Sequence, residues 1–187
     1  MRGTAALGPR WGRIAAWAAG VFALDQASKA AVLFLLRLPD RGVIDVAPPF
    51  LVLRMAWNRG VNFGLLATDS EAGRWALVAV ALGICALVLW WMRREGRGIA
   101  LISAGVLIGG ALGNVVDRVA YGAVADFLNM SCCGIDNPYV FNVADIAIVA
   151  GALGLALFSG TGRGEPPVGR GAARRQPRPP RRDAGGP

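Results

Sequence analysis

The chain has 187 residues, 55% of them hydrophobic, a composition that favours an integral membrane protein over a soluble domain. Its net charge is +8, but five of these charges lie in a Gly- and Pro-rich segment, residues 160–187, which argues against nucleic acid as a partner and fits anionic membrane lipids. Three Cys without metal-ligand spacing and the lack of any His argue against a metal site and exclude a His-based triad, which leaves carboxylates, Lys or Tyr for hydrolytic chemistry.

Four apolar stretches are long enough, as helices, to cross a hydrocarbon core of about 30 Å. They are residues 14–36, 75–92, 99–116 and 141–158. Arginines gather before the first stretch, between the second and third, and after the fourth, and basic residues beside membrane spans stay in the cytoplasm. We therefore expect an all-α integral membrane fold with four transmembrane helices in residues 14–159, a cytoplasmic N-terminus in residues 1–13, and a disordered basic cytoplasmic tail in residues 160–187.

The first stretch contains an acid and a base four residues apart, Asp25 and Lys29. On a helix this spacing puts both side chains on one face, where they can neutralise each other. Such a pair either fixes helix packing or supports a functional site, because charges inside a membrane are costly. The apolar run continues past Asp25 to Leu36, which favours an uncleaved anchor over a secretory signal.

The first connection, residues 37–74, is long and of mixed charge. Between Val43 and Trp57 it is rich in β-branched and aromatic residues and broken by Pro, a pattern typical of short strands. We expect a small extracytoplasmic β element between the first two helices, lying on the membrane. Asp69 and Ser70 then form a candidate cap for the second helix.

The third stretch carries glycines at four-residue intervals, Gly105, Gly109 and Gly113, which predict close packing against another helix. Asp117 and Arg118 close this stretch. Adjacent residues on a helix point in different directions, so we expect each of the two to engage a separate partner. An ordinary charged helix end explains the dipeptide equally well.

Two further acids flank the last connection. Asp126 follows the third stretch, and Asp145 lies about one turn into the fourth, so both fall at the outer boundary of the bilayer. If the two carboxyl groups share one water, like-charge repulsion raises one pKa and the pair can hold a single proton, as aspartic proteases do. The spacing alone leaves open two separate structural acids or a proton relay.

Four runs of residues, taken in order, resemble the motif blocks of the lipoprotein signal peptidases, also called signal peptidase II. The runs are Asp25 to Lys29, Asn58 to Gly64, Gly109 to Phe127 and Phe141 to Asp145, and the resemblance covers roughly residues 14 to 158. It implies a bacterial inner-membrane aspartic endopeptidase without metal or cofactor. Its substrates are prolipoproteins, cut on the amino side of a diacylglyceryl-modified Cys, and its active site lies near the periplasmic face. We expect a monomer.

The resemblance also implies roles for particular residues. Asp126 and Asp145 match the catalytic aspartates, and Asp25 and Lys29 match positions that support the site. The positions that shape the site or hold substrate backbone are Asn58, Gly60, Asn114, Asp117, Arg118 and Asn142.

Two features depart from the family pattern. Asn62 stands where the family often has Ala, and Cys132 and Cys133 occupy a connection outside the pattern. The cysteines are free thiols, a vicinal disulfide, or ordinary small loop residues.

Two other classes of function fit parts of the sequence. A small transporter or proton-conducting subunit would relay ions through Asp25, Asp126 and Asp145, but two of these acids lie at one interface rather than along a path. An assembly protein would account for the Gly-lined third helix and the basic tail, but not for the acids.

Overall fold

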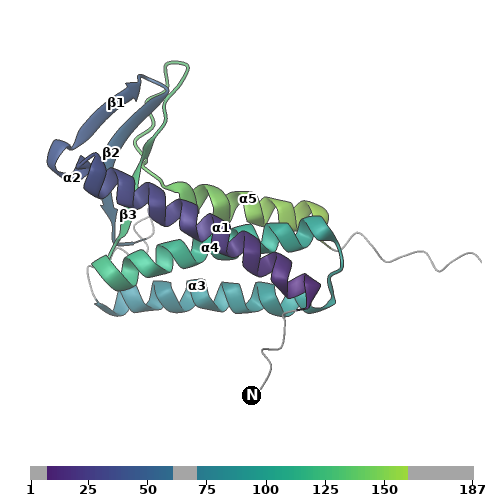
Figure 1. Cartoon of the computed structure of the whole chain (residues 1–187). Helices are drawn as coiled ribbons and strands as arrows, with labels where there is room; N and C mark the ends of the chain where they lie inside the picture. Colours follow the sequence, from purple (N-terminus) through teal and green to yellow (C-terminus); the bar gives the residue numbers. More distant parts are fainter. Residues whose placement is uncertain (1–7, 61–70, 160–187) are drawn as a thin grey trace, which may run out of the picture.

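The computed structural model describes residues 8–60 and 71–159. Its long helices lie side by side, and a small sheet rises from one end of them (Figure 1). The short segments η1 and η2 are a π-helical and a 3-10 turn that continue α1 and α3. In chain order the elements are α1 (Pro9–Ala30), η1 (Ala31–Leu35), α2 (Leu38–Arg41), β1 (Val43–Ala47), β2 (Leu51–Asn58), α3 (Glu71–Trp91), η2 (Met92–Arg94), α4 (Gly98–Tyr121), β3 (Val124–Asn129) and α5 (Val143–Phe158).

Three helices in the described part of the chain are long and apolar enough to cross a membrane: Arg10–Leu35, Glu71–Arg94 and Gly98–Tyr121. The first three predicted stretches are therefore confirmed as long apolar helices. The fourth, α5, is apolar but has 16 residues, which at 1.5 Å per residue is about 24 Å. It is shorter than the hydrocarbon core it would have to cross.

The helix boundaries differ from the predicted ones at two places that matter. α1 begins at Pro9 rather than at residue 14, because the fixed φ of proline suits the first helical turn. α4 continues to Tyr121 and ends where Gly122 adopts a left-handed conformation with φ of 76°. Asp117 and Arg118 consequently lie inside the helix, and the expectation that they close it was wrong.

α4 is the centre of the bundle and packs against α1, α3 and α5. Its glycines permit this close contact: a Cβ atom on Gly105 would lie 2.7 Å from the carbonyl oxygen of Ile14 in α1. On the other side, a Cβ atom on Gly151 of α5 would lie 2.6 Å from the backbone nitrogen of Leu107. The predicted tight packing of the third helix is thus confirmed.

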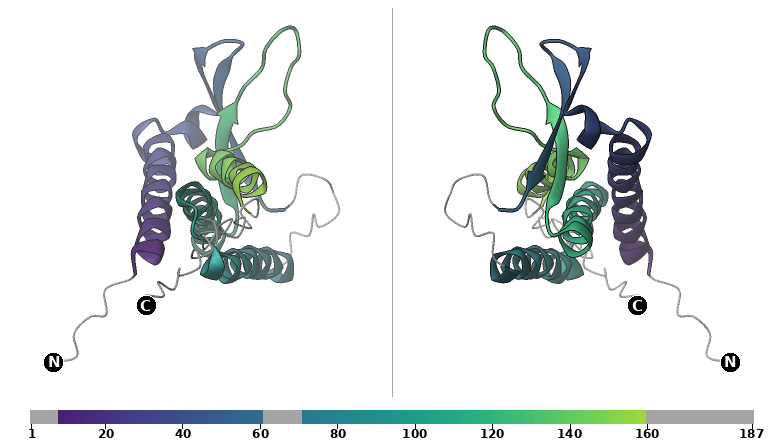
Figure 2. Two further views of the ribbon diagram at one scale, coloured as in Figure 1. Left: turned by 90° about the vertical axis from the view of Figure 1, so that its right-hand side faces the viewer. Right: turned by 90° about the vertical axis from the view of Figure 1, so that its left-hand side faces the viewer.

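The sheet is antiparallel, with the order β1-β2-β3. β1 and β2 confirm the β element predicted between the first two helices, but β3 comes from the segment after α4 and was not predicted. A cluster of buried side chains, Val32, Leu38, Leu53 and Phe127, joins the sheet to the end of α1. Figure 2 shows the sheet beside α5, and Leu128 of β3 forms a bridge with Phe141 just before α5 begins, so β3 and α5 bring their residues to one end of the bundle.

Candidate active site

The two predicted catalytic acids are carried by elements of different kinds. Asp126 lies in the middle of β3, opposite Ala56 of β2, and is 2% exposed. Asp145 is half-buried in the first turn of α5. Its position follows from a capping box: the Asn142 side chain accepts a hydrogen bond from the Asp145 nitrogen at 3.0 Å, and Asp145 Oδ2 accepts one from the Asn142 nitrogen at 3.2 Å.

Asn142 connects the two carboxyl groups. Besides capping α5 at Asp145, its side-chain Nδ2 donates to Asp126 Oδ1 at 2.6 Å. The remaining oxygens of the pair accept hydrogen bonds from two more asparagines: Asn58 Nδ2 donates to Asp126 Oδ2 at 3.1 Å, and Asn114 Nδ2 donates to Asp145 Oδ1 at 2.8 Å. All four carboxyl oxygens are therefore positioned by uncharged amide donors, and Asn142 donates a hydrogen bond to each of the two acids.

The electrostatic setting of Asp126 suits a carboxyl group that holds a proton. The pKa of Asp126 is raised to about 6: burial and then the neighbouring charge of Asp145 raise it, while hydrogen bonds from Asn58 and Asn142 and the charge of Lys29 act in the opposite direction. A carboxyl group in this range is partly protonated near neutral pH. The pair can therefore carry one proton between its two members.

A group of buried charges is linked to the pair through Asn114; we call Asp25, Lys29 and Asp117 the ion cluster. Lys29 Nζ lies 2.8 Å from Asp25 Oδ2 and 2.8 Å from Asp117 Oδ2. The predicted neutralisation of Asp25 by Lys29 is thus confirmed, with Asp117 as a second partner. Lys29 also donates to Asn114 Oδ1 at 3.1 Å, so this asparagine joins the ion cluster to Asp145.

The ion cluster also holds the two segments that carry the catalytic candidates. Asp117 Oδ2 accepts a hydrogen bond from the backbone nitrogen of Ala125, next to Asp126, at 3.1 Å. Asp25 Oδ1 accepts one from the backbone nitrogen of Ala144, next to Asp145, at 2.9 Å. Moving either acid of the ion cluster would therefore move β3 or the start of α5.

Gln26 belongs to this arrangement, although no role was predicted for it. Its Nε2 donates to Asp25 Oδ2 at 3.1 Å, to Asp117 Oδ1 at 3.2 Å and to the Gly113 carbonyl at 3.4 Å. The available signal was a polar side chain inside an apolar helix, directly beside Asp25.

Arg118 and Gly60 lie at the edges of the site. Arg118 Nη1 donates to the Asn114 carbonyl at 3.3 Å, and its charge acts on Asp126 and Asp145. The expectation that Asp117 and Arg118 have separate partners is therefore confirmed. Within the described residues the buried Arg118 Nε has no hydrogen-bond partner. The Gly60 nitrogen donates to Asn58 Oδ1 at 3.1 Å and so helps to orient that asparagine.

Of the two departures from the family pattern, the structure describes only the one at Cys132 and Cys133. Asn62 lies outside the described residues, as do Asp69 and Ser70. Cys132 and Cys133 are exposed free thiols in a turn where Cys133 has φ of 58°, so a vicinal disulfide is not present. In residues 8–60 and 71–159 there is no group of three or more His, Cys, Asp or Glu that could hold a metal ion.

Comparison with known proteins identifies the family. The family described as Signal peptidase (SPase) II matches residues 17–160. A lipoprotein signal peptidase of Methylobacterium sp. (strain 4-46) is 49% identical over 140 residues, which are 75% of this chain and 84% of the relative. One of Methylorubrum extorquens (strain PA1) is 47% identical over 137 residues, 73% of this chain and 79% of the relative.

Solved structures agree with this assignment. A bacterial membrane enzyme structure at 2.3 Å resolution has a TM-score of 0.66 and 25% identity, covering 78% of this chain and 86% of the other. Another, at 1.9 Å resolution, has a TM-score of 0.65 and 26% identity, covering 80% of this chain and 95% of the other. With a family match that spans most of the chain and relatives close to half identical, this protein belongs to the signal peptidase II family.

Proposed function

We propose that this chain is a membrane aspartic endopeptidase that removes signal peptides from prolipoproteins on the amino side of a diacylglyceryl-modified Cys, with Asp126 and Asp145 as its catalytic pair. Family membership supports the removal of signal peptides. The observation that carries the assignment of the pair is the double role of Asn142, which donates to Asp126 and to Asp145 from one position. Two acids held this closely can act on one water and one peptide bond.

The two acids have different roles in the proposed reaction. Asp145 is the more exposed of the two acids, and it takes the proton of the attacking water. Asp126 is buried with a raised pKa, and it donates its proton to the carbonyl oxygen of the scissile bond. Water attack then needs no metal, cofactor or nucleophilic Ser.

The surrounding residues have positioning and binding roles. The three asparagines Asn58, Asn114 and Asn142 orient the pair, and the ion cluster fixes the backbone beside each acid. Arg118, whose Nε has no hydrogen-bond partner in the part of the chain that the structure describes, and the backbone at Gly60 bind the substrate chain. A substrate whose acylated Cys is anchored in the bilayer brings its scissile bond to the height of this site.

The proposed topology has four spans, with α5 as the fourth. α5 packs along the whole centre of the bundle against α4, and the Arg97 side chain donates to the Phe158 carbonyl, so the end of α5 reaches the start of α4. The acids then lie at the periplasmic face of a bacterial inner membrane and the arginines at the cytoplasmic face, with both termini inside. The unit comprises residues 14–159 and acts as a monomer; residues 1–7 and the basic tail, 160–187, lie outside the described residues.

The test compares cleavage of lipid-modified and unmodified precursor by purified protein. Asp126→Asn and Asp145→Asn are each expected to lower kcat by at least about a thousandfold, because each removes one of the two proton-transfer groups. Asp136→Asn, a change at an exposed acid of the neighbouring connection, is the matched control and retains wild-type turnover. Substantial turnover by either dyad variant, or ion flux without peptide cleavage by the wild type, would remove the proposal.

A further inference from the structure

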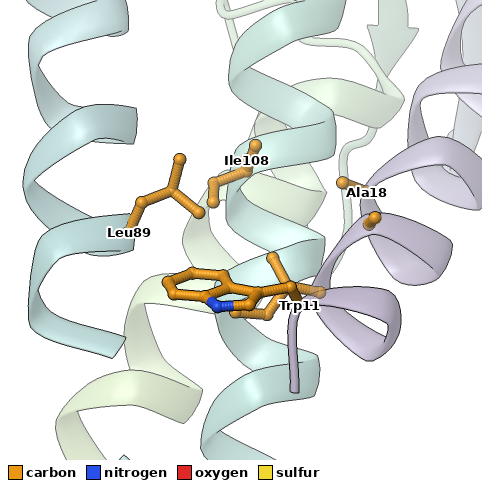
Figure 3. A pocket seen from close by; sticks show the side chains of 6 residues that line it. Trp11, Ala18, Leu89 and Ile108 are labelled. Atoms are coloured by element: carbon orange, nitrogen blue, oxygen red, sulfur yellow. The ribbon is translucent and has the colours of Figure 1, made fainter. Parts of the chain in front are cut away.

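An apolar groove lies near the opposite end of the bundle from the acids. Its walls are α1 and α3, which both pack on α4 but hardly touch each other, and α4 forms its floor. The cavity measures about 270 Å³ and is lined by Trp11, Ile14, Ala15, Ala18, Leu89 and Ile108. Figure 3 shows the Trp11 ring reaching from α1 into the space between the helices, with Leu89 and Ile108 beyond it. Its volume, just under the roughly 300 Å³ of small-ligand pockets, suits a segment of a hydrocarbon chain.

The groove opens on a side that the bilayer covers. Ala15 is exposed and Trp11 and Ala18 are half-buried, so the lining is accessible from outside the bundle. No polar group is among the lining side chains except the Trp11 indole nitrogen. In a membrane such a surface is occupied by an apolar chain, which a lipid, a signal peptide or a second copy of this protein could supply.

Exposed positive charge lies at the same end of the groove; we call Arg10, Arg13, Arg93 and Arg94 the arginine cluster. Arg10 Nη1 donates to the Arg93 carbonyl, which ties the ends of the two wall helices together. Arg93 follows the lining residue Leu89 by one helical turn, and the Arg13 guanidinium lies over Gly98 at the start of α4. In the described residues none of the four forms an ion pair with a carboxylate.

We propose that this groove binds a phospholipid with an anionic headgroup, the acyl chain lying against Trp11 and the phosphate against the arginine cluster. Charge selects this occupant over the alternatives. A precursor signal peptide carries a basic segment ahead of its apolar core, which the arginine cluster would repel. A second copy of this chain would bring a second arginine cluster to the same place. An anionic lipid supplies both the chain and the missing negative charge, and this binding does not depend on the peptidase reaction.

The test uses the full-length protein in nanodiscs of neutral phosphatidylcholine that contain phosphatidylglycerol brominated on its acyl chains. Bromine quenches nearby indoles, and the difference between wild type and Trp11→Phe isolates the Trp11 signal. We expect this quenching to reach half-saturation at a mole fraction at least about fivefold lower for brominated phosphatidylglycerol than for brominated phosphatidylcholine. Arg13→Gln/Arg93→Gln/Arg94→Gln should bring the two half-saturation mole fractions to within about twofold of each other.

Matched variants separate this site from general surface charge. Arg37→Gln/Arg41→Gln/Arg54→Gln removes the same charge from exposed positions near the sheet and should leave the preference intact. Ala15→Phe fills the groove and should abolish Trp11 quenching by either lipid, whereas Ala16→Phe, on a neighbouring exposed face of α1, should not.

Three results would overturn the proposal: equal quenching by both lipids, displacement of the brominated lipid by a signal peptide, or a dimer whose formation excludes it. Because no precursor is needed, the inactive variant Asp126→Asn should show the same lipid preference as the wild type. A failure of the peptidase assignment would therefore leave this measurement unaffected.

Discussion

Two groups of acids lie at the same end of the bundle, joined by Asn114, and they differ in the kind of group that contacts them. In the ion cluster, Asp25 and Asp117 share the Lys29 ammonium group at 2.8 Å each. In the proposed catalytic pair, Asp126 and Asp145 accept hydrogen bonds from amides, and among the described residues neither forms an ion pair with a Lys or Arg. Carboxylates in direct contact with an ammonium group fit a structural role, whereas a pair that accepts its hydrogen bonds from amides can hold and transfer a proton.

The largest expected effect comes from removing that cation. Lys29→Met leaves Asp25 and Asp117 buried without a counter-charge, which should lower the free energy of unfolding by about 3–5 kcal/mol. Reversible unfolding of the purified protein in detergent measures this loss. Adding Asp25→Asn to Lys29→Met should recover part of it, because one uncompensated charge is then gone. A Lys29→Met protein of wild-type stability but without activity would instead put Lys29 in the catalytic chemistry and erase the distinction between the two groups.

A smaller effect, on pH dependence, should appear at the catalytic pair. In the proposed mechanism Asp126 carries a proton, and because its pKa is about 6, kcat/KM should fall as the pH rises above that value. Asn58 donates to Asp126 and thereby favours the ionised form, so Asn58→Ala should raise the pKa of Asp126. A hydrogen bond to a charged group is worth about 1.5–3 kcal/mol, which moves the alkaline limb upward by about one to two pH units.

The pH–rate profile of both proteins between pH 5 and 9 decides this prediction, and the position of the limb is independent of any loss in maximal rate. Asn129→Ala is a suitable control, since Asn129 donates to the carbonyl oxygens of Asn137 and Tyr139 rather than to either acid. A limb that stays in place or moves to lower pH in Asn58→Ala would show that Asp126 is not the proton donor.

The contrast between the two groups also explains what could be read from the sequence. Asp25 and Lys29 are one helical turn apart, so a local rule was enough to pair them. The partnership of Lys29 with Asp117 depends on α1 lying against α4, which spacing along the chain does not reveal. Likewise, β3 is almost wholly buried and lacks the alternation of a half-exposed strand, and its partner β2 lies far upstream in the chain.

Among the asparagines, Asn142 was the most accessible to prediction from local chemistry, because Asn three residues before an acid at a helix start is a capping pattern. Its second bond, to Asp126, is a tertiary contact. Family resemblance singled out Asn58, Asn114 and Asn142 as a set, but only the fold reveals that each contacts one or both acids. Gln26 was missed because an uncharged amide inside an apolar helix is a weaker signal than a charge.

A change at Gln26 tests whether the ion cluster and the pair of Asp126 and Asp145 act separately, and it has the smallest expected effect. Gln26→Leu removes amide hydrogen bonds to Asp25 and Asp117 while Lys29 stays in place, so both carboxylates keep their counter-charge. The free energy of unfolding should therefore fall by about 1–2 kcal/mol, less than for Lys29→Met. Since Gln26 contacts neither member of the catalytic pair, the pH–rate limb should stay where it is in the wild type. A shift of that limb would mean that the pair and the ion cluster titrate together. Contact with Lys29 would then not distinguish the structural acids from the proposed catalytic ones.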